Sequence, residues 1–276
     1  MFAKILLTIL CLSMIAAAIY FDPTRRRSLL AAAAPEGPRL RLITWNIGYA
    51  DQEADSRAHT EDLRAVADII LSNNPDAVAL QELTGPEQLK TLLSYLRGQY
   101  RGAVAPSGNR DRVEAVLVRG DTVRFEPVPS GGENAISAAF HPNGSKSAEV
   151  VLVSAHADAF KGGRRRLFTG EVVDWARDRP RGSIVLIGGD FNFELNPKHE
   201  SHLFSDNVKA DSEAYSYLLK YFRDLGRDAG DTAVNDRRID YLFGPPEKLF
   251  LRRAEVLRNA ATGQMDHWPL LIEIVL

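Results

Sequence analysis

The sequence predicts an α/β fold in which two mixed β-sheets pack face to face and helices cover their outer faces. Strand-like and helix-like segments form two successive groups, and each group contains helices together with a run of strands. Layered α/β proteins show this kind of alternation. The chain has 276 residues, of which 45% are hydrophobic and 25% charged. It therefore contains enough apolar material for one large core.

The first group begins with a strand at residues 39–45, where apolar side chains recur at every second position. A helix follows, because apolar residues next recur with the spacing i, i+3, i+4, i+7 and i+8. These residues are Leu63, Val66, Ala67, Ile70 and Leu71. Residues 76–81 form an apolar run typical of a buried strand. Pro86, favoured in the first turn of a helix, then opens a second helix that extends to Arg97.

Strands dominate the middle of the chain, and two further helices interrupt the strands of its second half. The middle strands are expected at residues 113–118, 122–128, 135–140 and 149–155. Asn143-Gly144 predicts a tight hairpin between the last two, because this pair tolerates positive φ angles. The second group continues with a helix at 165–178, a strand at 184–187, a helix at 212–222 and strands at 238–243, 250–257 and 269–275.

The N-terminal segment differs from the rest of the chain. An apolar run at residues 5–20 ends near small residues at 16–18, where a signal peptidase could cut. Arg25-Arg26-Arg27 would hold that flank in the cytoplasm if the run stayed as an anchor, and a buried helix is a third interpretation. We predict a signal peptide or signal anchor at residues 1–21, a linker at 22–38 and one domain at 39–276. The protein is accordingly expected to be exported (periplasmic or secreted) or anchored in a membrane.

The charge balance is mildly acidic. Residues 1–38 contain four of the 34 Lys and Arg residues and two of the 36 Asp and Glu residues, which leaves the domain 30 basic and 34 acidic groups. A formal charge of −4 is not that of a dedicated nucleic-acid-binding protein. A nuclease remains compatible with it, because a local basic patch can hold the substrate.

Polar side chains stand at the ends of several predicted strands. Asn46, Glu82, Asp190 and Asn192 each follow or end an apolar run. Strand ends are where an α/β scaffold presents functional side chains on a rigid support. Carboxylate and amide oxygens suit Mg²⁺, Mn²⁺ or Ca²⁺ better than Zn²⁺.

Six sequence blocks, TWNIG, LQEL, SAHAD, GGDFN, RIDYLF and MDHWP, occur in this order from residue 44 to residue 269. Together they resemble the endonuclease/exonuclease/phosphatase superfamily, whose members include deoxyribonuclease I, abasic-site endonucleases, neutral sphingomyelinases and inositol polyphosphate 5-phosphatases. The resemblance covers nearly all of the chain past its N-terminal segment. It implies a four-layer α/β/β/α sandwich and a cofactor of Mg²⁺ or Mn²⁺. Glu82 would be the principal metal ligand, with Asn46 and Asp266 completing the ligand set.

The resemblance also implies the catalytic residues. Asp190 would position or deprotonate the attacking water, and Asn192 would donate to the phosphate. Asp240 would contact His267 and raise its pKa, so that the ring holds a proton against the phosphate. His156 would bind a phosphate oxygen or assist the leaving group. From the residues themselves we expect the side chains two apart in Asp190-Phe191-Asn192 to face the same way on an extended segment, and Gly188-Gly189 to leave room for a substrate phosphate.

A run of three arginines, Arg164, Arg165 and Arg166, follows His156 in sequence. It is either a solvated face or a contact to substrate phosphates that flank the scissile one. The leading interpretation is a divalent-metal-dependent phosphodiester hydrolase, an exported nuclease that acts as a monomer on nucleic acid. This is favoured over a sphingomyelinase-like lipid head-group phosphodiesterase because no exposed apolar insert is evident past the N-terminus. A small phosphoester phosphatase is also compatible with these residues, and so is a non-catalytic, membrane-tethered binding protein.

Overall fold

The computed structural model describes residues 37–48, 56–106, 111–120, 122–129, 134–142, 148–199, 201–247, 249–260 and 265–276. The predictions for residues 1–36 and for the Asn143-Gly144 turn lie outside these ranges. Within the described part of the chain, no helix has the length and apolarity needed to cross a membrane.

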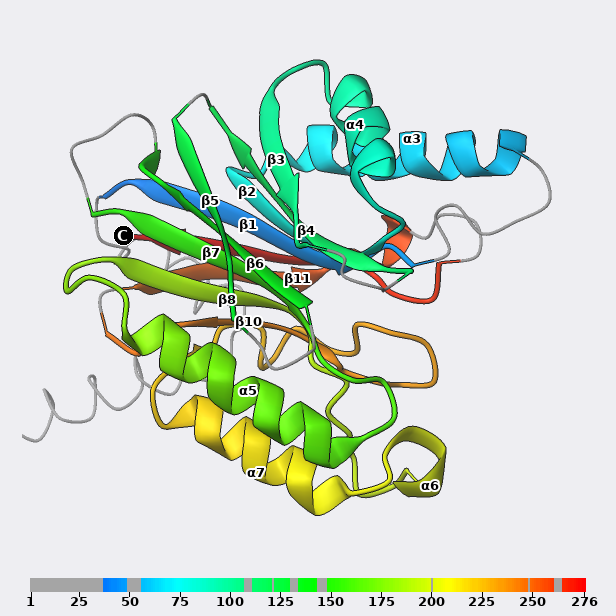
Figure 1. Ribbon diagram of the computed structural model, residues 1–276, viewed down its shortest axis with the longest axis vertical. Helices are drawn as coiled ribbons and strands as arrows, with labels where there is room; N and C mark the ends of the chain where they lie inside the picture. Colours follow the sequence, from blue (N-terminus) through cyan, green and yellow to red (C-terminus); the bar gives the residue numbers. More distant parts are fainter. Residues whose placement is uncertain are drawn as a thin grey trace, which may run out of the picture. The chain divides into compact units, whose positions relative to one another are not determined.

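Two six-stranded sheets form the centre of the domain (Figure 1). The first has the spatial order β11 (Phe250–Val256), β12 (Leu270–Val275), β1 (Arg39–Asn46), β2 (Ala77–Leu83), β4 (Val113–Arg119), β3 (Tyr100–Val104). The second has the order β5 (Val123–Pro127), β6 (Asn134–Phe140), β7 (Val150–His156), β8 (Ile184–Asp190), β10 (Asp240–Gly244), β9 (Arg223–Asp224). In each sheet one central pair, β1–β2 and β7–β8, is parallel, and the other pairs are antiparallel.

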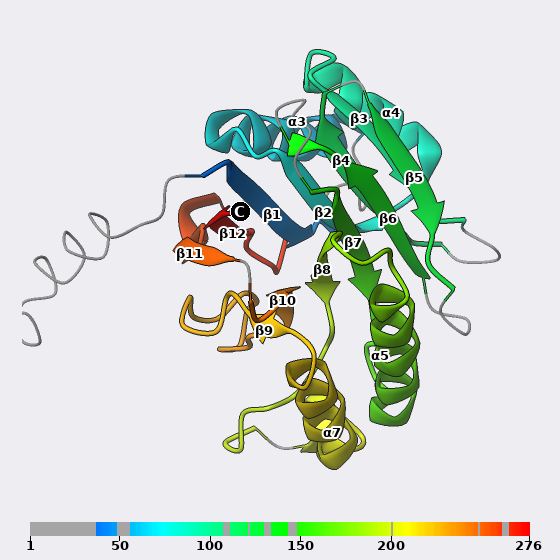
Figure 2. The same ribbon diagram turned by 90° about the vertical axis from the view of Figure 1, so that its left-hand side faces the viewer.

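Helices cover the outer face of each sheet, which confirms the predicted four-layer α/β/β/α sandwich. The helices α3 (Ser56–Asn73) and α4 (Pro86–Tyr95) pack on the first sheet, and α5 (Gly162–Arg177) and α7 (Val208–Leu219) pack on the second (Figure 2). Two short segments complete the described helices, namely α6 (Ser201–Phe204) and the 3-10 turn Arg258–Ala260.

The alternating side chains of each strand separate the core into layers. On β1, Leu40 and Leu42 point between the sheets, whereas Ile43 and Trp45 pack beneath α3 and α4. Successive strand residues face opposite sides of a sheet, and here both sides are buried. The apolar stripe predicted for residues 63–71 lies on α3 against this first sheet.

Several boundaries differ from the predictions. The helix expected at 165–178 begins at Gly162, and the helix expected at 212–222 spans Val208–Leu219. Edge strand β3 (Tyr100–Val104) was not predicted. It is short, contains a glycine and pairs only with β4, so its local sequence carries a weak strand signal.

Candidate active site

The predicted functional residues meet at one edge of the two sheets. Asn46 and Glu82 stand at the carboxyl ends of the parallel strands β1 and β2, and His156 is paired in register with Asp190 at the ends of β7 and β8. Because the sheets pack face to face, these four strand ends converge. Asn46 Nδ2 donates to both Glu82 Oε1 (2.9 Å) and Asp190 Oδ2 (3.0 Å). Asn46 therefore ties one sheet to the other at the site.

A local distortion of β2 aims the Glu82 side chain. The pairing of β2 with β4 shifts register between Leu80 and Leu83, and Glu82 has a φ of 62°. Bulges and left-handed non-glycine residues are enriched next to active sites, where they redirect side chains. Gly48 leaves the space that the carboxylate occupies, because a Cβ there would lie 2.3 Å from Glu82 Oε2. The backbone N–H of Gly48 also donates to Asn46 Oδ1 (2.8 Å).

Asp190 and Asn192 lie together, but not because the segment is extended. β8 ends at Asp190, and Asn192 has a φ of 52°. The Asn192 N–H donates to Asp190 Oδ1 (2.9 Å), while its Nδ2 donates to Ala157 O (3.2 Å) and lies 3.4 Å from His156 Nε2. The expectation of an extended segment was wrong, since a turn after the strand brings the amide back toward His156.

Gly188 and Gly189 serve packing rather than substrate access. A Cβ on Gly188 would lie 3.3 Å from both Ala79 Cβ and Thr44 Cβ in the facing sheet, and one on Gly189 would lie 1.9 Å from Ala155 O in the neighbouring strand. The space expected for a substrate phosphate is thus filled by protein. These glycines allow the sheets and strands to approach closely beneath the site.

Asp240 and His267 form a buried carboxylate–imidazole pair. His267 Nδ1 lies 2.8 Å from Asp240 Oδ2, Asp240 is fully buried, and Trp45 Nε1 donates to the His267 carbonyl (3.1 Å). Burial by itself lowers the pKa of His267, but the Asp240 carboxylate and nearby acids outweigh it and raise that pKa to about 10. The Nε2 atom lies 3.8 Å from Asp190 Oδ2. The ring thus faces the residues around Asp190, and we call Asn46, Glu82, His156, Asp190, Asp240, Asp266 and His267 together the candidate catalytic cluster.

Glu114 gives His156 a similar arrangement, which sequence reasoning missed. His156 Nδ1 lies 3.5 Å from Glu114 Oε1, and its Nε2 lies 3.7 Å from Glu82 Oε1 and 3.6 Å from Asp190 Oδ2. Burial lowers the pKa of His156, but Glu114, Asp190 and Glu82 together raise it to about 9. The sequence signal was a single acid within the apolar strand run Val113–Arg119. Nothing in the sequence showed that β4 would lie opposite β7.

Asp266 lies beside His267 rather than on a shared strand. Its carboxylate is 43% exposed, and its Oδ1 is 3.9 Å from His267 Nε2. β12 begins only at Leu270, so strand alternation does not separate Asp266 from His267 as expected. Asp266 therefore stands at the solvent side of the cluster.

The donor atoms of this cluster suit a cation. Among the described residues, the ion pairs of Glu82, Asp190, Asp240 and Asp266 are all to histidines. Glu82, His156 and Asp190 offer ligand atoms within 4.8 Å of one another. Carboxylates gathered beside only two imidazoles leave an excess of negative charge, which a divalent ion would offset. Asn46 presents its NH₂ group to the two carboxylates, so it orients them here.

The three arginines predicted to bind substrate have different environments, and for Arg165 the prediction was wrong. Arg165 is fully buried and donates to Asp211 through Nε (2.7 Å) and NH2 (2.8 Å). It also donates to Ser205 Oγ (2.6 Å) and to Asp158 O (2.9 Å). Each of the three guanidinium nitrogens donates at least one hydrogen bond inside the protein. Arg165 is therefore a structural residue that joins α5 to α7 and to the segment before α7.

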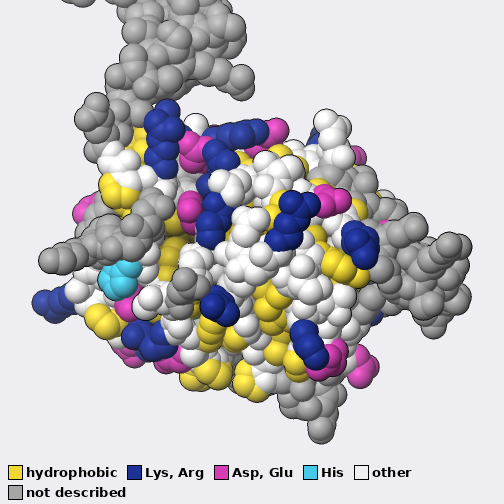
Figure 3. Space-filling view, turned by 90° about the horizontal axis from the view of Figure 1, so that it is seen from above, with side chains coloured by type: hydrophobic (Ala, Val, Ile, Leu, Met, Phe, Trp, Pro, Cys, Tyr) yellow, Lys and Arg dark blue, Asp and Glu magenta, His cyan; other side chains and the backbone are white. Residues whose placement is uncertain are grey.

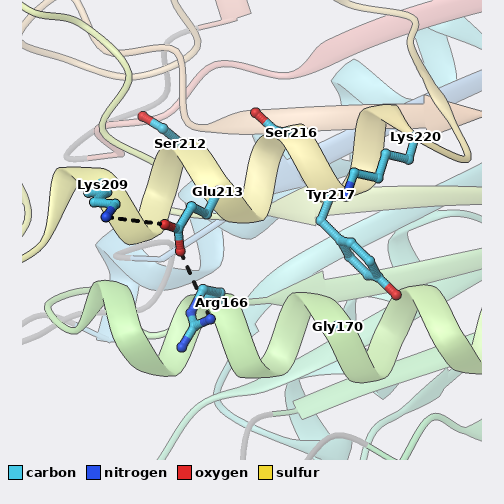
Figure 4. A pocket seen from close by; sticks show the side chains of 8 residues that line it. All are labelled: Arg166, Gly170, Lys209, Ser212, Glu213, Ser216, Tyr217 and Lys220. Atoms are coloured by element: carbon cyan, nitrogen blue, oxygen red, sulfur yellow. Dashed lines mark ion pairs between the residues drawn. The ribbon is translucent and has the colours of Figure 1, made fainter.

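Arg164 and Arg166 remain exposed, but each lies near an acid. Arg164 NH1 is 3.3 Å from Asp158 Oδ2. Arg166 points into a groove of about 550 Å³ between α5 and α7 (Figure 4), where it lies 3.9 Å from Glu213. This groove is on the outer helical layer, and Lys209 approaches the same glutamate (3.9 Å). The candidate catalytic cluster does not include either arginine.

Comparisons with known proteins bear on the family and on the fold. A model of the family described as "Endonuclease/Exonuclease/phosphatase family" matches residues 43–262, whereas no curated protein matches the sequence. The fold is similar to an endonuclease/exonuclease/phosphatase from Bacteroides vulgatus (18% identity, TM-score 0.67, covering 86% of this chain and 99% of that one). It is also similar to D. rerio TDP2 humanized by 14 mutations (16%, 0.66, 86% and 99%). The human Nocturnin catalytic domain with bound sulfate is a third similar structure (17%, 0.62, 87% and 95%).

Proposed function

Because the chain belongs to the Endonuclease/Exonuclease/phosphatase family, we propose that it is a divalent-metal-dependent phosphodiester hydrolase. The observation that carries the proposal is the convergence of Glu82, Asp190 and two carboxylate-paired histidines, His156 and His267, at one sheet edge. Hydrolysis of a phosphodiester requires positive charge on the phosphate, an oriented water and a proton for the leaving oxygen. The cluster contains groups for each of these tasks.

Glu82 is the residue that would hold Mg²⁺ or Mn²⁺, with Asp266 as a candidate further ligand on the solvent side. When bound, such an ion supplies Lewis-acid charge to a phosphoryl oxygen. Asn46 keeps the Glu82 and Asp190 carboxylates at a fixed separation through its Nδ2 hydrogen bonds. Gly48 preserves the space for Glu82.

The chain's own residues would move the protons. His267, whose pKa is raised to about 10, is protonated at neutral pH and can donate Nε2–H to a phosphate or leaving oxygen. His156, with its pKa raised to about 9, can hold a second phosphate oxygen. Asp190 can accept a proton from the attacking water, and Asn192 supports it through the N–H bond to Oδ1.

The substrate predicted from the sequence, nucleic acid, remains a proposal, as do export and the monomeric state. Arg165 does not support a nucleic-acid substrate, because its guanidinium is buried. On the face seen in Figure 3, Lys and Arg side chains are interspersed with acidic, apolar and neutral ones. A continuous basic band would favour nucleic acid more strongly.

The test is hydrolysis by the full chain of bis-nitrophenyl phosphate, DNA, RNA and phospholipid diesters, with Mg²⁺ and with EDTA. Glu82→Gln should lower kcat by at least ~100-fold, because a strong charge partner of the transition state is lost. Glu87→Gln is the matched control, since that side chain is 87% exposed on α4. Full turnover in EDTA, or equal effects of the two variants, would refute the proposal.

A further inference from the structure

Three large apolar side chains are exposed at the active-site end of the domain. Phe160 is 77% exposed, Leu203 63% and Val234 40%. They lie in the segments that join β7 to α5, β8 to α7 and β9 to β10, and all three segments lie on the right-hand side of Figure 1. Isolated exposed apolar residues are common on soluble domains. These three matter because their segments adjoin one another.

Direct contacts join the three segments. The Gly162 N–H, two residues after Phe160, donates to Asp206 Oδ1 (2.9 Å) in the segment that contains Leu203. The Arg237 guanidinium, near Val234, lies 4.5 Å from the Phe204 ring centroid. Phe160, Leu203 and Val234 are thus held on neighbouring segments, and we call them the apolar rim.

The apolar rim borders the candidate catalytic cluster. Phe160 follows His156 by four residues, so their Cα atoms are at most about 14 Å apart. The Val234 N–H donates to the carbonyl of Asp266 (2.9 Å), next to His267. A surface that touches the rim would therefore lie close to the cluster.

The chemistry of the rim favours a lipid surface over a nucleic acid. Two of the three rim side chains, Leu203 and Val234, are aliphatic and have no ring on which a base could stack, so Phe160 alone could stack on one. The exposed cations beside Phe160 are offset by carboxylates, since Lys161 lies 3.2 Å from Asp206 and Arg164 lies near Asp158. Apolar side chains among balanced charges gain free energy by entering hydrocarbon, whereas a polyanion needs a surplus of positive charge.

The length of chain before the domain permits this contact. β1 begins at Arg39 and ends at the site, and its eight residues span about 25 Å at ~3.3 Å each. Residues 22–38 can extend to roughly 55 Å. If the apolar run at residues 5–20 inserts in a membrane, this linker is long enough for the site end to reach the same bilayer.

We propose that the apolar rim is a bilayer-contact surface that brings the active site to the phosphodiester of phospholipid head groups. The substrate part of this inference rests on the proposed hydrolase function. The contact part rests on the rim alone. It also revises the expectation that no exposed apolar insert exists past the N-terminus.

Tryptophan quenching tests the contact without using activity. The full chain carrying Phe160→Trp is reconstituted with phosphatidylcholine/phosphatidylglycerol vesicles whose acyl chains are brominated. Leu219→Trp is the matched control, because Leu219 is 40% exposed at the far end of α7 from Asp206. We expect quenching above that of the unsubstituted protein for Phe160→Trp only. Equal quenching of both variants, or none, would overturn the inference. A fluorescence change with single-stranded DNA but not with lipid would also overturn it.

Hydrolysis then separates this inference from the proposed function. Phe160→Ser/Leu203→Ser/Val234→Ser should lower hydrolysis of a phospholipid diester in vesicles by at least about tenfold, with soluble bis-nitrophenyl phosphate unaffected. Equal loss on both substrates would overturn the inference. Quenching at position 160 without hydrolysis of any diester would support the contact while the proposed function failed.

Discussion

Replacing Arg165 should destabilise the domain severely. Arg165→Met removes both bonds to Asp211 and the bond to Ser205, and it leaves the fully buried Asp211 carboxylate with the Glu194 N–H (3.1 Å) as its remaining donor. Breaking a buried, hydrogen-bonded ion pair costs about 3–5 kcal/mol, because the other charge stays uncompensated. With a urea m-value of about 2–3 kcal/mol/M, the unfolding midpoint should fall by about 1–2 M.

Equilibrium urea unfolding followed by circular dichroism measures this loss. Arg164→Ala is the control, because Arg164 is 70% exposed and its pair with Asp158 should contribute at most about 1 kcal/mol. Arg165→Met/Asp211→Leu should recover part of the loss, since it removes both charges. The structural role would be refuted if Arg165→Met kept the midpoint of the parent and weakened polyanion binding instead.

Three other perturbations test different parts of the structure. Gly189→Ala should prevent normal folding, seen as a lost or strongly shifted thermal transition, because its Cβ would lie 1.9 Å from Ala155 O; an unchanged Tm would contradict the close approach. If Asp240 and His267 act as one unit, each alanine variant should lower kcat by at least ~100-fold. Their double variant should be little worse than the weaker single one, whereas multiplicative losses would show independent roles. Burial raises the pKa of Asp158, but hydrogen bonds from the backbone N–H groups of Phe160 and Lys161 outweigh this effect, so the pKa lies below its usual range. The loss of stability caused by Asp158→Ala, measured by urea unfolding, should therefore be full above pH ~4 and should vanish as the pH falls further. A loss of stability that grows in acid would contradict the lowered pKa of Asp158.

Local patterns of the sequence were sufficient for the layers of the fold. Alternation in residues 39–45 predicted β1, and the stripe at residues 63–71 predicted α3, because each pattern reports which face of one element is buried. The weakest predictions concerned short elements at the edges, such as β3. β3 pairs with one strand only, so few of its residues need to be apolar and its sequence carries little strand pattern.

Motif order also indicated which polar residues would converge, and the structure brings Asn46, Glu82, Asp190 and His267 within a chain of contacts shorter than 4 Å. The ligand roles of Asn46, Glu82 and Asp266 stay predictions. So do the export and anchoring predicted for the N-terminal segment. The ligand roles depend on a bound ion, and export and anchoring depend on a membrane, so contacts within the chain do not decide them.

The sequence by itself determined the sheets, the covering helices and the strand ends at which polar residues stand, since these follow from periodicity and motif order. Only the tertiary structure decided that Arg165 is buried, that Glu114 pairs with His156 and that Phe160 lies exposed beside the site. Arg165 and Arg164 are neighbours of the same type, yet one is enclosed and the other is in solvent. The physical reason is that burial and pairing of a side chain depend on elements distant in sequence that pack against it, and local sequence does not record them.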